Sequence, residues 1–352
     1  MENQTLSNTN ISGCVDDELL RTPLAALYSA IFILGLPGNL LALWVFLCVH
    51  SKKNSMRVFL INLALADLLL IVCLPFRIQY HVSGNQWKLV GWLCKLVGYL
   101  FYMNMYISIT LLGLISVDRY LRIYGSVRTR SKLQSPLRSM VVCAFVWLVS
   151  LALMIPVVVY EDYEESTEKC FHYRKTDVRK ASIKLFIVVV FWLIFTALMV
   201  SYGKIGQKLL KRSHQNSNLP NASHYSRIAR KSFFILFVFI VCFVPYHIFR
   251  GFYIKTQITD SSCYWRNLAD KFNEISLVFS ALNSCLDPIM FFLLSASVRR
   301  EVRRFMNSMF RTRVSSEASG GNTTSELDSR RPSKDPMVRN LTEREERSCS
   351  SN

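Results

Sequence analysis

Two arginines stand inside long apolar segments of this chain, where a charge needs a reason. Arg77 follows Leu74-Pro75-Phe76, and Arg250 comes three residues after His247, on the same face of a helix. The planar fork of arginine makes paired, charge-assisted hydrogen bonds with phosphate and carboxylate groups. These arginines therefore predict a pocket for an anion. The alternative is that their long side chains reach out of the apolar layer to water.

Tyr102 and Tyr106, Asn273 and Glu274 also lie toward these same ends of the apolar segments. They supply hydroxyl, amide and carboxylate groups near the arginines.

A second group of polar residues lies deeper in the apolar segments, where a charge costs on the order of a few kcal/mol. The group is Asp67, Asn104, Ser108, Asn283 and Asp287, and Asn39 and Ser284 lie in the same apolar segments. Asn104 and Ser108 are four residues apart and share a helix face. A buried carboxylate among amide and hydroxyl oxygens can hold a small hard cation such as sodium. The same residues could instead form a hydrogen-bond network that joins helices.

The elements that must position these side chains are membrane helices. The chain has 352 residues, is 51% hydrophobic and has a formal net charge of +18, a combination that is rare in a soluble domain. Seven apolar runs are each long enough to cross a bilayer as a helix. They cover residues 24–49, 57–80, 92–121, 138–160, 181–209, 228–253 and 268–294. The sequence thus predicts an all-α membrane protein, a seven-helix bundle over residues 24–294 whose two termini lie on opposite sides.

The basic residues decide the orientation, because short cytoplasmic loops collect lysine and arginine. The loops after the first, third and fifth runs are strongly basic, whereas residues 161–180 mix acids and bases. Residues 1–23 are therefore predicted to be extracellular, with Asn3 and Asn10 as glycosylation acceptors. Because the bases lie between apolar runs rather than on one face, nucleic acid is not expected as a partner.

Four cysteines fall on the predicted outer side, where the compartment is oxidising. They are Cys14, Cys94, Cys170 and Cys263. Four cysteines allow three pairings, and their spacing does not choose among them.

Several short motifs together resemble the rhodopsin-like G-protein-coupled receptors. They are Gly38-Asn39-Leu40, Leu65-Ala66-Asp67-Leu68-Leu69, Asp118-Arg119-Tyr120, Trp147, residues 242–247 and Asn283-Ser284-Cys285-Leu286-Asp287-Pro288. Phe243, together with His247 and Arg250, resembles the nucleotide-receptor branch of that family. Residues 101–108, 170–174, 244–250 and 261–265 are similar to the lysophosphatidylserine receptors within the branch.

The resemblance implies a role for each motif. Cys94 would pair with Cys170, and Cys14 with Cys263. Asp118, Arg119 and Tyr120 would couple to a heterotrimeric G protein, while the deeper polar group would bind an allosteric sodium ion, with no other cofactor. The ligand-binding residues would be Arg77, Tyr102, Arg174, His247, Arg250, Asn273 and Glu274.

The resulting hypothesis is a multi-pass plasma-membrane receptor for an anionic lysophospholipid, lysophosphatidylserine above others, that signals through Gi-type G proteins. Glu274 would face the serine ammonium, and an acyl chain would lie along the third to fifth helices. A nucleotide is the alternative ligand, because the same arginines suit its phosphates. No paired catalytic groups or metal-ligand spacing appear, so no enzyme is expected.

Two segments follow the bundle. Residues 295–310 alternate basic and apolar side chains at helical spacing, which predicts an amphipathic eighth helix on the inner membrane surface. Residues 311–352 are polar and charged, which predicts a disordered cytoplasmic tail whose serines and threonines, once phosphorylated, could recruit an arrestin-like partner.

Overall fold

A computed structural model gives the architecture of the chain. It describes residues 18–49, 55–124, 135–160, 170–171, 173–215, 222–295, 297–304 and 307. Asn3, Asn10, Cys14 and the predicted tail lie outside these ranges, so the glycosylation and arrestin predictions remain predictions.

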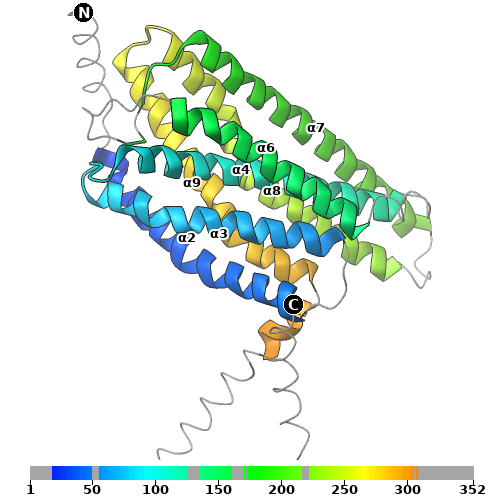
Figure 1. Ribbon diagram of the computed structural model, residues 1–352. Helices are drawn as coiled ribbons and strands as arrows, with labels where there is room; N and C mark the ends of the chain where they lie inside the picture. The colour runs from blue at the N-terminus through cyan, green and yellow to red at the C-terminus, as the bar shows by residue number, and fades with distance from the viewer. Residues whose placement is uncertain are drawn as a thin grey trace, which may run out of the picture.

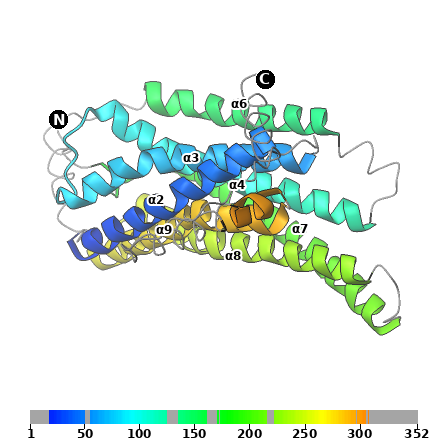
Figure 2. The ribbon, with the colours of Figure 1, turned by 90° about the horizontal axis from the view of Figure 1, so that it is seen from below.

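The described chain is all-helical, and seven of its helices are long and apolar enough to cross a membrane. In chain order they are α2 (Glu18–Trp44, continued by the π-helical turn η1, Val45–Val49), α3 (Ser55–Val82), α4 (Gly91–Tyr124), α6 (Pro136–Tyr160), α7 (Val178–Gln215), α8 (Ala222–Ile258) and α9 (Cys263–Leu294). They run side by side as one bundle (Figures 1 and 2). The predicted seven-helix fold is confirmed.

Each helix extends beyond its predicted apolar run, because hydropathy marks only the part of a helix that lipid must cover. α2 begins at Glu18 rather than near residue 24, and its first turn carries an ion pair between Arg21 and Glu18 at 3.4 Å. Polar turns of this kind belong to the helix but not to the apolar layer.

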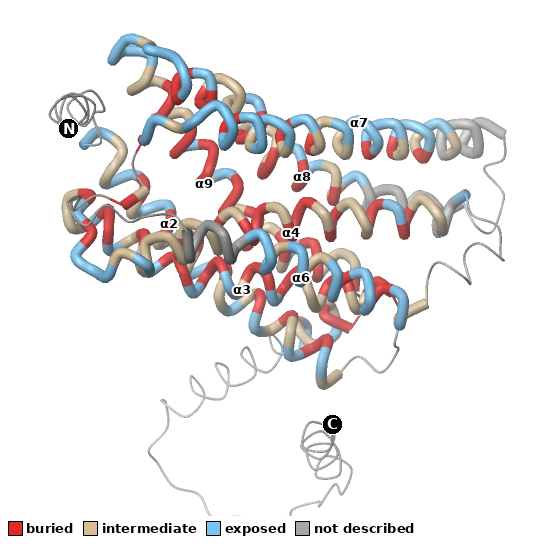
Figure 3. Tube along the Cα trace, turned by 45° about the horizontal axis from the view of Figure 1, so that its top comes forward, coloured by how far each residue is buried: buried red, intermediate tan, exposed pale blue. Residues whose placement is uncertain are grey.

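α4 forms the centre of the bundle and packs against α3, α6, α7, α8 and α9. α6 and α7 lie at the periphery, with mostly exposed outer faces (Figure 3). Their exposed side chains are large and apolar, among them Val141, Phe145, Leu148, Phe186 and Leu193. An apolar outer surface on a polar-lined bundle is what a lipid environment requires.

The close contact between α2 and α9 depends on two glycines of α2, which have no side chain to hold the helices apart. A Cβ atom on Gly38 would stand 2.7 Å from the ring of Pro288, and one on Gly35 would stand 3.3 Å from the carbonyl of Ser284. Asn39 joins the same helices, since its Nδ2 donates to Ser284 O at 2.8 Å. The kink-prone Pro288 thus sits in a close-packed seam.

A short helix follows α9, as the amphipathic pattern predicts. Residues 297–304 are helical, and Ser295 Oγ accepts a hydrogen bond from Val298 N at 3.3 Å, as an N-cap does. Arg299 NH1 donates to the terminal carbonyls of α9 at Phe292 (3.1 Å) and Leu293 (2.7 Å). Carbonyls at a helix end attract a cation, so this contact fixes the turn between the two helices.

Candidate functional site

For the description of the site, the end of the bundle with the Cys94–Cys170 disulfide is called the outer end. The opposite end, which carries Asp118, Arg119 and Tyr120, is called the inner end. The disulfide joins α4 to the loop before α7, with the two Cα atoms 5.9 Å apart. This predicted pairing is confirmed. Cys263 is also disulfide-bonded, but Cys14 lies outside the described residues, so that pairing remains a prediction.

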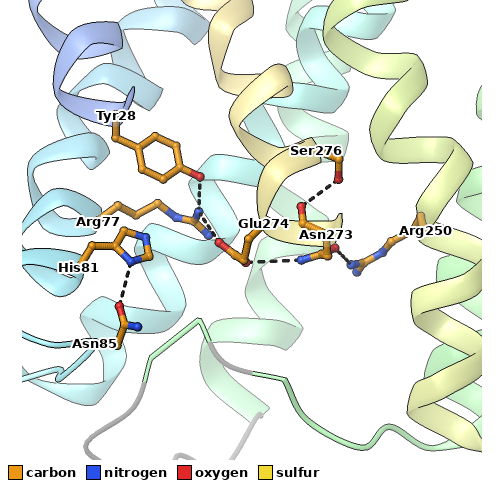
Figure 4. A network of polar contacts seen from close by, with 8 residues as sticks. All are labelled: Tyr28, Arg77, His81, Asn85, Arg250, Asn273, Glu274 and Ser276. Atoms are coloured by element: carbon orange, nitrogen blue, oxygen red, sulfur yellow. Dashed lines mark hydrogen bonds and ion pairs between the residues drawn. The ribbon is translucent and has the colours of Figure 1, made fainter. Parts of the chain in front are cut away.

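Four of the predicted ligand-binding residues, Arg77, Arg250, Asn273 and Glu274, meet at the outer end in one polar chain across the bundle (Figure 4). Arg77 NH1 on α3 lies 3.7 Å from Glu274 Oε2 on α9. Asn273 Nδ2 donates to Glu274 Oε1 at 3.5 Å, and Asn273 Oδ1 accepts from Arg250 NH1 on α8 at 2.9 Å. The adjacent residues Asn273 and Glu274 therefore connect the two arginines.

The two arginines have different surroundings. Arg77 is 2% exposed, donates to Tyr28 OH at 2.8 Å and lies against the rings of Phe101 and Phe171. Its charge is paired with a carboxylate. Arg250 is only half-buried, and no carboxylate within the described chain pairs with it.

Tyrosine rings surround Arg250. Its guanidinium carbon lies 5.7, 5.3 and 5.0 Å from the ring centroids of Tyr102, Tyr246 and Tyr253. Such rings attract a cation through their faces but do not neutralise it. Arg250 is thus a half-buried positive charge within a cage of three tyrosine rings.

His247 lies one helical turn deeper than Arg250. Its ring stacks on Phe191 with the centroids 3.5 Å apart, and its Nδ1 is 2.8 Å from Phe243 O. Phe191 in turn stacks with Phe195 and Phe239. These residues form an aromatic wall where α7 meets α8, and His247 belongs to that wall rather than to the polar chain.

Arg174 is exposed on the loop before α7. Its main-chain carbonyl accepts a hydrogen bond from Gln257 Nε2 at 2.9 Å. Its predicted role as a ligand contact remains a prediction.

Apart from Tyr102, the sequence prediction missed the aromatic side chains that contact the arginines. Tyr246 and Tyr253 lie four residues before and three after Arg250, a spacing that already places them on its helix face. Tyr28 and Phe171 carry no such signal, because they come from α2 and from a loop.

The deeper polar group also comes together, near the middle of the bundle. Asp67 Oδ1 accepts from Ser284 Oγ at 3.2 Å and from the amides of Asn104 and Asn283 at 3.4 Å each. Asn283 Nδ2 also donates to Asp287 Oδ2 at 2.9 Å. Two carboxyl groups from α3 and α9 therefore share one amide donor.

This cluster has more acceptors than donors. Four buried oxygens have no hydrogen-bond partner within the described part of the chain: Asp67 Oδ2, Ser108 Oγ, Asn283 Oδ1 and Asp287 Oδ1. Unpaired buried oxygens are costly, and a hard cation would satisfy them. The residues thus fit the predicted sodium ion.

At the inner end, the predicted coupling triplet lies in the last two turns of α4, which ends at Tyr124. Asp118 and Arg119 are 4% and 9% exposed, and both make contacts within the bundle. Tyr120 stacks on Tyr124 with the centroids 4.9 Å apart. Ser116, one turn earlier, hydrogen-bonds to Tyr202 OH on α7 at 2.7 Å.

Similarity to known proteins identifies the family of this chain. Residues 38–291 match the model of the 7 transmembrane receptor (rhodopsin family). The chain belongs to this family of G-protein-coupled receptors. It is therefore a multi-pass membrane receptor, with a small-molecule ligand and a G protein as partners, and not an enzyme.

The relatives include receptors of two kinds. The receptor is 48% identical to Probable G-protein coupled receptor 34 of Mus musculus, over 90% of this chain and 85% of that protein. It is 35% identical to a purinoceptor of Bos taurus, over 83% of this chain and 88% of that protein. It is also 36% identical to the Uracil nucleotide/cysteinyl leukotriene receptor of Homo sapiens, over 78% of this chain and 74% of that protein. The predicted nucleotide-receptor-like branch is confirmed.

Proposed function

We propose that this receptor binds an anionic lysophospholipid, lysophosphatidylserine above others, from the extracellular side of the plasma membrane. The observation that carries the proposal is Arg250, a half-buried cation that is caged by tyrosines and paired only with the neutral amide of Asn273. A phosphate in this cage would gain charge-assisted hydrogen bonds without first breaking an internal ion pair.

Glu274 supports a ligand with an ammonium group as well. Glu274 lies next to Asn273 and is 9% exposed. A ligand whose anionic group binds Arg250 could therefore place an ammonium group against this carboxylate. The head group of lysophosphatidylserine carries a phosphate, a carboxylate and an ammonium, which would complement two arginines and one glutamate.

The aromatic wall of Phe191, Phe195 and Phe239 favours a ligand that carries an acyl chain rather than a second polar group. It begins beside His247, one turn below Arg250, and continues deeper to Phe239 at the junction of α7 and α8. Burial of each methylene there would contribute about 0.8 kcal/mol.

Binding would act by population shift. A ligand that binds better to the state with an open inner end moves the receptor toward that state, and the G protein strengthens ligand binding in return. We expect G proteins of the Gi type, with Asp118, Arg119 and Tyr120 at the contact. The sodium ion at Asp67 would favour the inactive state.

A G-protein activation assay across lysophospholipid head groups and nucleotides tests the proposal. Lysophosphatidylserine should be the most potent, and potency should fall about fourfold for each methylene removed from its chain. A flat response to chain length, with activation by a nucleotide, would favour the second candidate. The relatives named for purines and uracil nucleotides are the reason to include it.

A further inference from the structure

The described residues just before α7 contact the surroundings of both arginines. We call residues 170–171 and 173–177 the strap. At one end Cys170 is tied covalently to Cys94 on α4. The next residue, Phe171, has a backbone φ of 48°, and its ring lies 4.5 Å from the guanidinium carbon of Arg77. A left-handed conformation is uncommon for phenylalanine, so the surrounding contacts must hold it.

Those contacts come from a small aromatic cluster. The ring of Phe171 packs edge-on against Tyr80 and Trp87, at centroid distances of 5.4 and 5.8 Å. This half of the strap is therefore held by a disulfide and by buried rings.

The other half of the strap touches the cage of Arg250 through one tyrosine ring. Tyr173 is 4% exposed and packs edge-on against Tyr253, with the centroids 5.6 Å apart. Tyr253 is one of the rings that face Arg250. The strap thus touches the surroundings of both arginines, one through Phe171 and the other through Tyr173.

A single glutamine fastens this second half to α8. Gln257 is 6% exposed, and its main-chain oxygen accepts a hydrogen bond from Thr176 N at 3.2 Å. Its side-chain Nε2 donates to Arg174 O at 2.9 Å, and its Oε1 accepts from Lys184 Nζ on α7 at 3.4 Å. Gln257 therefore joins the strap, α7 and α8 at one point.

An ion pair at the surface adds to this fastening. Lys175 Nζ lies 2.6 Å from Asp260 Oδ1, and Arg266 NH2 lies 3.8 Å from the same oxygen. Lys175 lowers the pKa of Asp260 below its ordinary value, so the pair persists at neutral pH. Asp260 is 90% exposed, and exposed pairs contribute little, so the buried glutamine carries more of the attachment.

We propose that Gln257 is a clasp that holds the strap closed over the anion-binding residues and thereby sets how fast a ligand enters and leaves. This inference rests on the proposed ligand site beneath the strap. Cys170 is fixed by the disulfide and residue 177 continues into α7. The hydrogen bonds between residues 174–176 and Gln257 are therefore the contacts that can release without breaking a covalent bond. Opening there exposes Tyr173 and separates its ring from the cage of Arg250.

The test compares Gln257→Ala with Thr259→Ala in the purified full-length receptor. Thr259 lies two residues further on, is exposed, and hydrogen-bonds only with Lys255 O and Ser261 in the described chain. Gln257→Ala keeps the main-chain oxygen that accepts from Thr176 N but removes the side-chain bonds to Arg174 O and Lys184 Nζ. Hydrogen–deuterium exchange without ligand measures the strap: exchange at residues 173–177 should rise in Gln257→Ala, because the strap is loosened, but not in Thr259→Ala. Unchanged exchange at residues 173–177 would overturn the clasp.

The second measurement is kinetic and uses labelled oleoyl-lysophosphatidylserine. Loss of one to two buried hydrogen bonds should raise its association and dissociation rates together, by about fivefold or more, and leave the equilibrium affinity less changed. Faster exchange with unaltered rates would reject control of ligand entry. If the wild-type receptor binds no lysophospholipid, the proposed function fails, while the exchange experiment still decides whether Gln257 holds the strap.

Gln257→Ala is at a buried position, so a second variant guards against misfolding. Lys175→Ala changes only the exposed ion pair and should produce the same two effects at about twofold or less. A normal thermal transition in both variants, with no change in exchange in either, would also overturn the proposal.

Discussion

The two polar clusters of this receptor have opposite charge balances. At the outer end, two arginines face one glutamate, and the less buried arginine pairs only with an amide. In the middle, two aspartates face only neutral donors, and several buried oxygens have no donor among the described residues. The first cluster therefore has an excess of positive charge and the second an excess of negative charge. Our proposals of an anionic ligand for the first and of a sodium ion for the second rest on this difference.

The largest expected effect is at the outer cluster. Arg250→Ala should lower the potency of lysophosphatidylserine by about a hundredfold or more, because a buried anion would lose its charged partner. Arg250→Lys is the matched control. It keeps the charge but loses the paired hydrogen-bond geometry, so its potency should lie between those of the wild type and Arg250→Ala. Full potency in Arg250→Ala, with normal surface expression, would remove the anion site.

A smaller loss of potency should distinguish the role of Glu274 from that of the arginines. Glu274→Gln should lower the potency of lysophosphatidylserine about tenfold, because the ligand ammonium loses a charged acceptor. Lysophosphatidic acid has no ammonium, and its potency should not fall. An equal loss for both lipids would mean that Glu274 acts only by holding Arg77.

The middle cluster should make agonist affinity depend on the sodium concentration, whichever head group the agonist carries. Sodium should lower agonist affinity several-fold in the wild-type receptor, and Asp67→Asn should abolish this dependence because the amide cannot offer a charged oxygen. Radioligand competition in sodium and in a large organic cation measures it. The sodium site is falsified if the variant and the wild type show the same salt response.

The smallest effect tests the packing that carries Ser284 and Asn39 to the middle cluster. Gly38→Ala should lower stability by about 1–3 kcal/mol, because its Cβ would overlap the ring of Pro288. Gly203→Ala on α7, where the added carbon meets nothing within 4 Å, is the matched control and should be neutral or slightly stabilising. Thermal unfolding of the purified variants in detergent measures both.

The sequence by itself determined the seven helices and identified most of the polar residues of both clusters. Apolar length is a local property that predicts a membrane helix, and a charge inside such a run is costly enough to indicate a function. Helical spacing also places Tyr246 and Tyr253 on the face of Arg250, a signal that the sequence prediction missed.

Only the tertiary structure decided which groups balance which charges. Arg77 and Arg250 look alike in the sequence, but Glu274 and Tyr28 reach only Arg77, because α2, α3 and α9 converge there. Likewise, nothing in the spacing of Gln257 shows that it fastens a loop to two helices. Hydropathy and spacing describe one helix at a time, whereas charge balance depends on contacts between helices that are far apart along the chain.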